Sequence, residues 1–252
     1  MRIVDIEAIA ISAPNPAGTY WGKASWGAEA ADGPPNPLAH WQPTQVPHPA
    51  RMRPSYAVGI DTTLVRIETD SGLVGWGEAK APVAPRVAQT IINDLLRELV
   101  IGADPRNIEV IWETLYASMR LRGHDGGFLV EAISGIDIAL WDLFGQATGQ
   151  PVGRLLGGRY RERVRPYASL LMDEPAALAE QLLAIREQGF RAFKIGWGPF
   201  GRQSNATDEA IVRAARDAVG PDSLLMVDAG GSDGFWPNGY KWALRTAQML
   251  AN

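Results

Sequence analysis

The stretch SLLMVDAGGSDGFW, residues 223–236, decides how the second half of this chain folds. Apolar residues run without interruption from Leu224 to Val227, and Asp228 then opens a glycine-rich segment. A short apolar run bounded by turn residues is typical of a buried strand. Asp228 either caps a turn or stands in a site at the end of that strand, and the residues alone leave both interpretations open.

Two earlier segments, VRPYASLL (164–171) and FRAFKIG (190–196), also read as strands. A helical pattern follows each strand. The helices are marked by Leu178, Leu182 and Ile185 before Gly189, by a cap at Thr207 with Ile211, Ala214, Ala215 and Ala218 facing inward, and by residues 240–250.

Alternating strands and helices are the signature of parallel βαβ units. A (β/α)₈ barrel contains eight such units in roughly 250 residues, and we count three. We therefore expect residues 126–252 to form the start of a barrel, truncated before its fourth strand. The alternative is a small three-stranded layered fold.

The first part of the chain has a different pattern, which predicts an N-terminal α+β domain over residues 1–125. Strands are expected at 1–11, with Ile3, Ile9 and Ile11 on one face, and on both sides of the turn Asp70-Ser71-Gly72, at 57–69 and 73–79. Helices are expected with apolar stripes at Val83, Val87, Ile91 and Leu95, then from a cap at Asp104-Pro105 through Ile108, Ile111 or Trp112, Leu115 and Met119, and from 128 to 147.

A long segment, residues 13–54, separates the first two expected strands and carries Trp21, Trp26 and Trp41. Connections of this length are either disordered or functional. Because disordered segments are poor in aromatic residues, the tryptophans favour a loop that folds over something apolar or planar.

Composition excludes several classes of protein. The 252 residues are 46% hydrophobic and 21% charged, the net charge is -4, and there is no cysteine. These values predict a globular protein without disulfides or thiolate chemistry, and without the basic surface that nucleic acid requires. Neither a signal peptide nor a membrane-spanning run is recognisable, so we expect no membrane partner and a cytoplasmic location.

Lys194 is the second candidate for chemistry beside Asp228. Strand alternation puts it on one face with residues 192 and 196. An inward lysine is costly unless it is paired or functional, although a lysine at a strand end can also reach solvent. A lysine and an aspartate on adjacent strand ends suggest a base beside a metal-binding or proton-handling carboxylate.

Four segments together resemble the enolase superfamily, in its mandelate racemase / muconate lactonizing enzyme branch. They are TDSGLVGWGEA (69–79), AISGIDIALWDLFGQATGQPVGRLLGG (132–158), GFRAFKIG (189–196) and VGPDSLLMVDAG (219–230). The resemblance implies a capping domain followed by a barrel, with Mg²⁺ held by acids at the ends of three successive barrel strands. Asp228 matches the first of these acids.

The resemblance also implies a chemistry. Members of this branch remove the proton α to a carboxylate, and the resulting ene-diolate is stabilised by Mg²⁺. The branch usually has Lys-x-Lys at the second barrel strand, whereas this chain has Lys194-Ile195-Gly196. A gapless alignment puts Lys194 at the first lysine, near the substrate carboxylate, and an alignment on KIGW alone puts it at the base.

The departure at Gly196 fits a sugar-acid dehydratase that takes its base from a later strand, typically a histidine paired with aspartate. The alternatives are a racemase, epimerase or cycloisomerase of the same branch, or a non-catalytic fragment. The substrate is expected to be a small carboxylate such as a sugar acid, and the full-length protein is expected to be a homo-oligomer.

In this family the early loop of the capping domain helps to select the substrate. Trp21, Lys23 and Trp26 are therefore our candidates for substrate contact. His40, His48 and His124 lack metal-ligand spacing, but His124 could approach the boundary between cap and barrel.

Overall fold

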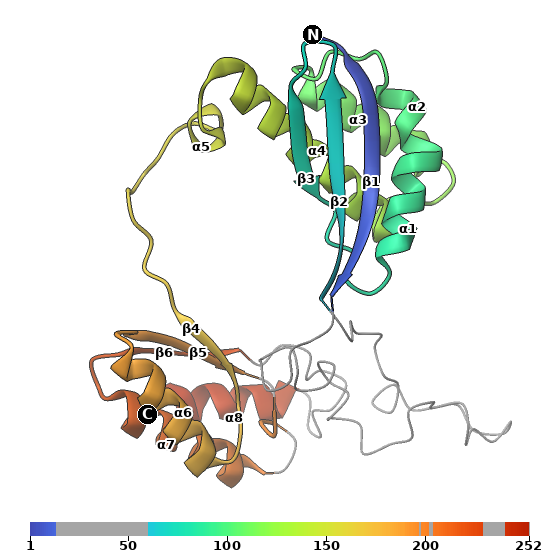
Figure 1. The fold of residues 1–252 in the computed structure, drawn as a ribbon. Helices are drawn as coiled ribbons and strands as arrows, with labels where there is room; N and C mark the ends of the chain where they lie inside the picture. Colours follow the sequence, from blue (N-terminus) through green and yellow to red (C-terminus); the bar gives the residue numbers. More distant parts are fainter. Residues whose placement is uncertain (14–59, 197, 202–203, 229–239, 252) are drawn as a thin grey trace, which may run out of the picture. The chain divides into compact units, whose positions relative to one another are not determined.

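The computed structural model describes residues 1–13, 60–196, 198–201, 204–228 and 240–251. The chain divides into two compact units (Figure 1). Of the described residues, 1–13 and 60–162 form the first unit, and those from 163 onward form the second. The long segment 14–59 lies outside the described residues.

The first unit contains an antiparallel sheet with the strand order β1-β2-β3. Its strands are β1 (Ile3–Ala13), β2 (Ile60–Thr69) and β3 (Val74–Glu78). A register shift between Ile3 and Asp5 alters the alternation of β1. The sheet therefore buries Ile3, Ile6 and Ala8 and leaves Ile11 exposed, so the predicted face of Ile3, Ile9 and Ile11 is wrong.

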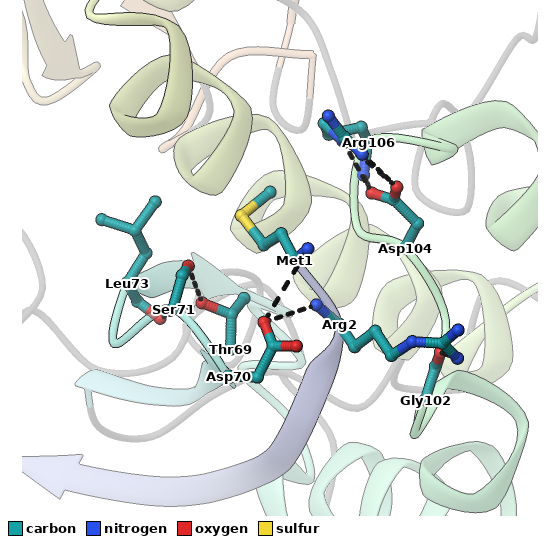
Figure 2. Close-up of polar contacts among 9 residues, drawn as sticks. All are labelled: Met1, Arg2, Thr69, Asp70, Ser71, Leu73, Gly102, Asp104 and Arg106. Atoms are coloured by element: carbon teal, nitrogen blue, oxygen red, sulfur yellow. Dashed lines mark hydrogen bonds and ion pairs between the residues drawn. The ribbon is translucent and has the colours of Figure 1, made fainter.

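The predicted turn between β2 and β3 is confirmed, because Gly72 has the positive φ of 80° that favours glycine. Figure 2 shows how the chain start is fixed to this turn. The Asp70 carboxylate accepts a hydrogen bond from the backbone N–H of Arg2 at 2.8 Å and lies 3.9 Å from the amino group of Met1. Thr69 and Ser71 hydroxyls lie 3.0 Å apart on the same turn.

Helical residues 85–100 run along β1 as α1 (Pro85–Thr90), a π-helical stretch η2 (Ile91–Leu96) and α2 (Arg97–Val100). Asn93 exchanges hydrogen bonds with the Ala8 backbone, Gln89 donates to the Ala8 carbonyl, and Arg97 donates to the Ile6 carbonyl. These three polar side chains satisfy backbone hydrogen-bonding groups at the outer edge of β1. They also fix the rotation of helical residues 85–100 about their own axis.

As a result, the apolar stripe predicted for this helix is wrong by about one position. The buried residues are Ala88, Ile92, Leu96 and Val100, whereas Val83, Val87 and Leu95 are exposed.

The next helix, α3 (Ile108–Arg120), buries Ile108, Ile111 and Leu115 as predicted. Asp104 is not its cap, because α3 begins three residues after Pro105. The Asp104 carboxylate instead accepts hydrogen bonds from the backbone and guanidinium of Arg106, as Figure 2 shows. These bonds hold the pKa of Asp104 well below its ordinary range.

Helix α4 (Phe128–Thr148) forms the centre of the first core and is followed by the short α5 (Val152–Leu155). The predicted face of Ile133, Ile136, Leu140 and Leu143 is buried. The helix packs so closely on β3 that a Cβ on Gly77 would overlap the Gly135 carbonyl. A Cβ on Gly135 itself would lie 2.7 Å from Val65 Cγ2, which explains the glycine in SGIDIALWDL.

Side chains of α4 also satisfy the outer edge of β3. Asp142 accepts a hydrogen bond from the Trp76 backbone N–H at 2.9 Å, and Gln146 donates to the Val74 carbonyl at 2.7 Å. Gln146 donates to Asp142 as well, at 3.0 Å. These contacts occupy backbone groups that could otherwise pair with another strand.

The second unit is a parallel sheet of three strands in the order β4-β5-β6, which confirms the predicted βαβ pattern. Leu170, Phe193 and Ile195 project from one face into a core with the helices, which lie together on that side of the sheet in Figure 1. The elements are β4 (Ala168–Leu171), α6 (Pro175–Glu187), β5 (Ala192–Gly196), α7 (Asn205–Val219), β6 (Leu224–Asp228) and α8 (Tyr240–Ala251).

Helix α7 starts earlier than predicted, because Ser204 and not Thr207 is its cap. The Ser204 hydroxyl accepts a hydrogen bond from the backbone N–H of Thr207 at 3.1 Å.

Helix α4 belongs by its contacts to the first unit, so the packing divides the chain after α5. The boundary expected from the sequence, at residue 125, precedes α4. Within the described ranges, no helix is long and apolar enough to cross a membrane.

Candidate active site

The candidate site lies on the face of the parallel sheet opposite the helices. Register pairs Lys194 with Met226, and Gly196 with Asp228, across β5 and β6. Since neighbouring residues in register share a face, Lys194 and Asp228 project to the same side. Asp228 is the last residue of β6, at the carboxyl edge of the sheet.

The structure brings the two predicted residues together. Lys194 Nζ lies 3.0 Å from Asp228 Oδ2, and their side chains are 31% and 36% exposed. The hydrogen bond that Lys194 donates to Asp228 is the main cause that raises the pKa of Lys194 above its ordinary value. In this arrangement Lys194 is a fixed positive charge at neutral pH and a poor proton acceptor.

Tyr167, which the sequence pattern does not indicate, also belongs to this site. Lys194 Nζ lies 5.5 Å from the centroid of the Tyr167 ring, within the range of a cation–π contact. Tyr167 precedes β4 and is 47% exposed. Register pairs Ser169 with Lys194, and alternation from Ser169 puts Tyr167 on the same face. The place of Tyr167 depends on the pairing register of β4 with β5, which cannot be read from the sequence of one strand alone.

Gly196 of β5 lies against Asp228 of β6. A Cβ at this position would overlap the Asp228 carbonyl oxygen and lie 3.0 Å from the Asp228 Cβ. Position 196 therefore has no room for a side chain in this arrangement, and its glycine supplies no proton acceptor.

The residues at this edge of the sheet match the expected Mg²⁺ in the type of donor atom but not in the number of ligands. Mg²⁺ prefers oxygen ligands, and the Asp228 carboxylate supplies them. Across the described part of the chain, however, no group of three or more His, Asp or Glu side chains is arranged to hold a metal ion. At the end of β6 the described residues thus offer the Asp228 carboxylate, with a lysine ammonium beside it.

The other predicted residues are not placed at this site. Trp21, Lys23, Trp26, His40 and His48 lie outside the described residues. His124 follows α3 in an exposed turn, where its backbone N–H donates to the Met119 carbonyl at 3.3 Å.

Two family models match the chain. The "mandelate racemase / muconate lactonizing enzyme, N-terminal domain" matches residues 41–157, and the "enolase C-terminal domain-like" family matches residues 177–252. Together they include β2, β3 and the helices of the first unit, and β5 and β6 with the helices of the second unit from residue 177 onward.

Individual relatives agree with these families. D-galactarolactone cycloisomerase of Agrobacterium fabrum is 43% identical over 171 residues, which are 66% of this chain and 43% of the relative. D-galactonate dehydratase of Variovorax paradoxus is 39% identical over 170 residues, 66% of this chain and 44% of the relative.

A solved structure is similar over nearly the whole chain. It is a racemase from Streptomyces coelicolor with bound magnesium, with a TM-score of 0.75 and 28% identity. The match covers 99% of this chain and 59% of the racemase. The chain therefore spans less than half the length of the two curated relatives and somewhat more than half of the solved structure.

Proposed function

This chain belongs to the mandelate racemase / muconate lactonizing enzyme branch of the enolase superfamily. On that premise we propose that it forms part of a Mg²⁺-dependent sugar-acid dehydratase. The reaction starts with removal of the proton α to the substrate carboxylate. The ion pair of Lys194 and Asp228 is the observation that supports this proposal.

The physical requirement is charge stabilisation. A proton α to a carboxylate is too weakly acidic for an ordinary side chain to remove, unless the negative charge that develops on the carboxylate is offset. Bound Mg²⁺ would supply that offset as a Lewis acid. Asp228, at a strand end with its carboxylate toward the open face, is the residue of this chain that would hold the ion.

Lys194 contributes the second positive charge. A lysine is protonated at neutral pH even at its ordinary pKa, so we assign Lys194 to stabilise the substrate carboxylate electrostatically and not to remove the proton. The glycine at position 196 is consistent with this assignment, because no second lysine stands beside Lys194 on this strand. We assign the base to none of the described residues.

Dehydration then completes the reaction. The α-proton leaves to the base, the hydroxyl on the neighbouring carbon leaves with a proton as water, and the enol product becomes a 2-keto-3-deoxy acid. Trp21, Lys23 and Trp26, in the segment between β1 and β2, remain our candidates for contacts with the sugar chain.

A cycloisomerase is the second candidate, because the cycloisomerase relative is 43% identical to this chain and the dehydratase relative is 39% identical. Both relatives are named for galactose-derived substrates, so the choice concerns the fate of the intermediate more than the class of substrate.

The test uses a chimaera, called the joined protein below, in which residues 1–252 of this chain are fused to the remaining C-terminal part of the Variovorax dehydratase. This joined protein should form a 2-keto-3-deoxy acid from D-galactonate only when Mg²⁺ is present. Conversion of D-galactarolactone into a ring-opened product of the same mass, without loss of water, would favour the cycloisomerase. Failure of a folded joined protein to act on either compound would contradict the proposal.

The 252-residue chain by itself should not turn over a sugar acid, because its described residues supply one carboxylate and no assigned base. Turnover by the purified chain above a protein-free control, dependent on added Mg²⁺, would show that the site is more complete than we propose.

A further inference from the structure

A buried carboxylate of the second unit has no part in the function proposed above. Asp208 lies in the first turn of α7 and is 1% exposed. Burial of a carboxylate is costly unless its oxygens are hydrogen-bonded. Both oxygens are used here: Oδ1 accepts the Gly201 backbone N–H at 2.8 Å, and Oδ2 accepts the Trp242 indole N–H at 2.9 Å.

These two bonds connect two different segments. Gly201 belongs to the loop that follows β5, the strand that carries Lys194. Trp242 belongs to α8, the helix that follows β6, whose last residue is Asp228. Asp208 therefore joins the chain after the lysine strand to the chain after the aspartate strand.

Phe200 and Gly201 of this loop are closely packed against Trp242. Gly201 has a φ of 76°, and a Cβ there would lie 2.9 Å from the indole of Trp242. Phe200, fully buried, meets the same indole edge-on with ring centroids 5.6 Å apart. At the start of the loop, the Gly196 carbonyl accepts the Met172 backbone N–H at 2.7 Å. Gly196, at the carboxyl end of β5, is thus bonded to Met172, and Gly201, five residues later, is bonded to Asp208 and packed on Trp242.

We propose that Asp208 is a positioning residue: by holding the loop after β5 against α8, its buried carboxylate fixes the strand ends on which Lys194 and Asp228 stand. The effect of Asp208 on catalysis rests on the proposed function, whereas its effect on the contact between Lys194 and Asp228 does not. Small displacements at a catalytic site are costly, since a shift of about 1 Å can lower a rate by a factor on the order of 100.

The test measures the Lys194–Asp228 contact directly in the full 252-residue chain. Scalar coupling across the hydrogen bond, between Lys194 ¹⁵Nζ and the Asp228 carboxylate carbon, reports the contact without substrate or metal. Asp208→Asn removes one acceptor oxygen, and Trp242→Phe removes the indole donor while keeping an aromatic ring. We expect the coupling to be lost in both variants.

Ser223→Ala is the matched control. Ser223 is buried in the same unit and donates to the Val219 carbonyl at 2.8 Å, but it precedes β6 at the amino edge of the sheet. This variant should lower stability and retain the coupling. If Asp208→Asn does not fold, Trp242→Phe decides the question alone.

A coupling that persists in the folded Asp208 and Trp242 variants would overturn the proposal and leave Asp208 with a purely stabilising role. Failure of the dehydratase proposal would not affect this result. If the positioning role holds in the joined protein, Trp242→Phe should lower kcat with little change in KM.

Discussion

Lys194 and Asp228 form an ion pair across neighbouring strands, with Nζ 3.0 Å from Oδ2. The pairing gives each charge a partner on the open face of the sheet. It also means that a cation at Asp228 must share or replace the lysine ammonium as the partner of that carboxylate. The two residues therefore have to be tested separately.

Lys194→Arg and Lys194→Met separate charge from proton transfer. If Lys194 acts electrostatically, arginine keeps the positive charge and should retain partial exchange of the substrate α-proton with deuterated solvent in the joined protein. Methionine should lose nearly all of it. Equal loss in both variants would instead identify Lys194 as the base, because arginine cannot give up its proton at working pH.

Gly135→Ala tests the close approach of α4 to the antiparallel sheet. The added Cβ would lie 2.7 Å from Val65 Cγ2 and 2.9 Å from the Ala79 backbone N. We expect the free energy of unfolding to fall by about 1–3 kcal/mol, as for other overpacked cores. Denaturant unfolding measures this change.

Gly153→Ala is its matched control. Gly153 lies in the short α5, with no atom within 4 Å of an added Cβ. This variant should be neutral, or more stable by up to about 1 kcal/mol because alanine favours helix. Equal destabilisation by both variants would contradict the packing explanation of Gly135.

Asp137→Asn should stabilise the first unit at neutral pH. Burial is the main cause that raises the pKa of Asp137, and the charge of Glu109 raises it further. A raised pKa means that the fold prefers the protonated acid, so this contribution to stability is greatest below pH of about 4 and is lost as pH rises through the raised value.

Asparagine stays neutral at every pH. We therefore expect the free energy of unfolding to rise by about 0.5 kcal/mol at pH 7 and to stay unchanged at pH 3. Glu109→Gln should give a smaller gain of the same sign. A loss of stability in Asp137→Asn at pH 7 would show that the ionised carboxylate supports the fold.

The sequence predicts the order of elements because each rests on a local pattern. The parallel units follow from apolar strands such as 224–228 and from helices with buried stripes such as Leu178 and Leu182. The pairing of Lys194 with Asp228 could be expected as well, since carboxyl ends of neighbouring parallel strands meet at one edge.

The details that failed depend on tertiary contacts. The rotation of residues 85–100 is set by hydrogen bonds of Gln89, Asn93 and Arg97 to β1, which their helical spacing alone does not reveal. Likewise, Asp208 reads as an ordinary acidic residue near a helix start, and only the packed loop and Trp242 show that it is buried.

The measurement that most directly tests Asp228 as the metal carboxylate is Mg²⁺-dependent α-proton exchange in the joined protein, compared with its Asp228→Asn variant. Asparagine keeps the shape of the side chain and removes the charge that offsets the cation. We predict that the exchange is lost by several orders of magnitude while circular dichroism shows an unchanged fold. Near-normal, Mg²⁺-dependent exchange in a folded Asp228→Asn variant would contradict the assignment and reduce Asp228 to a turn residue paired with Lys194.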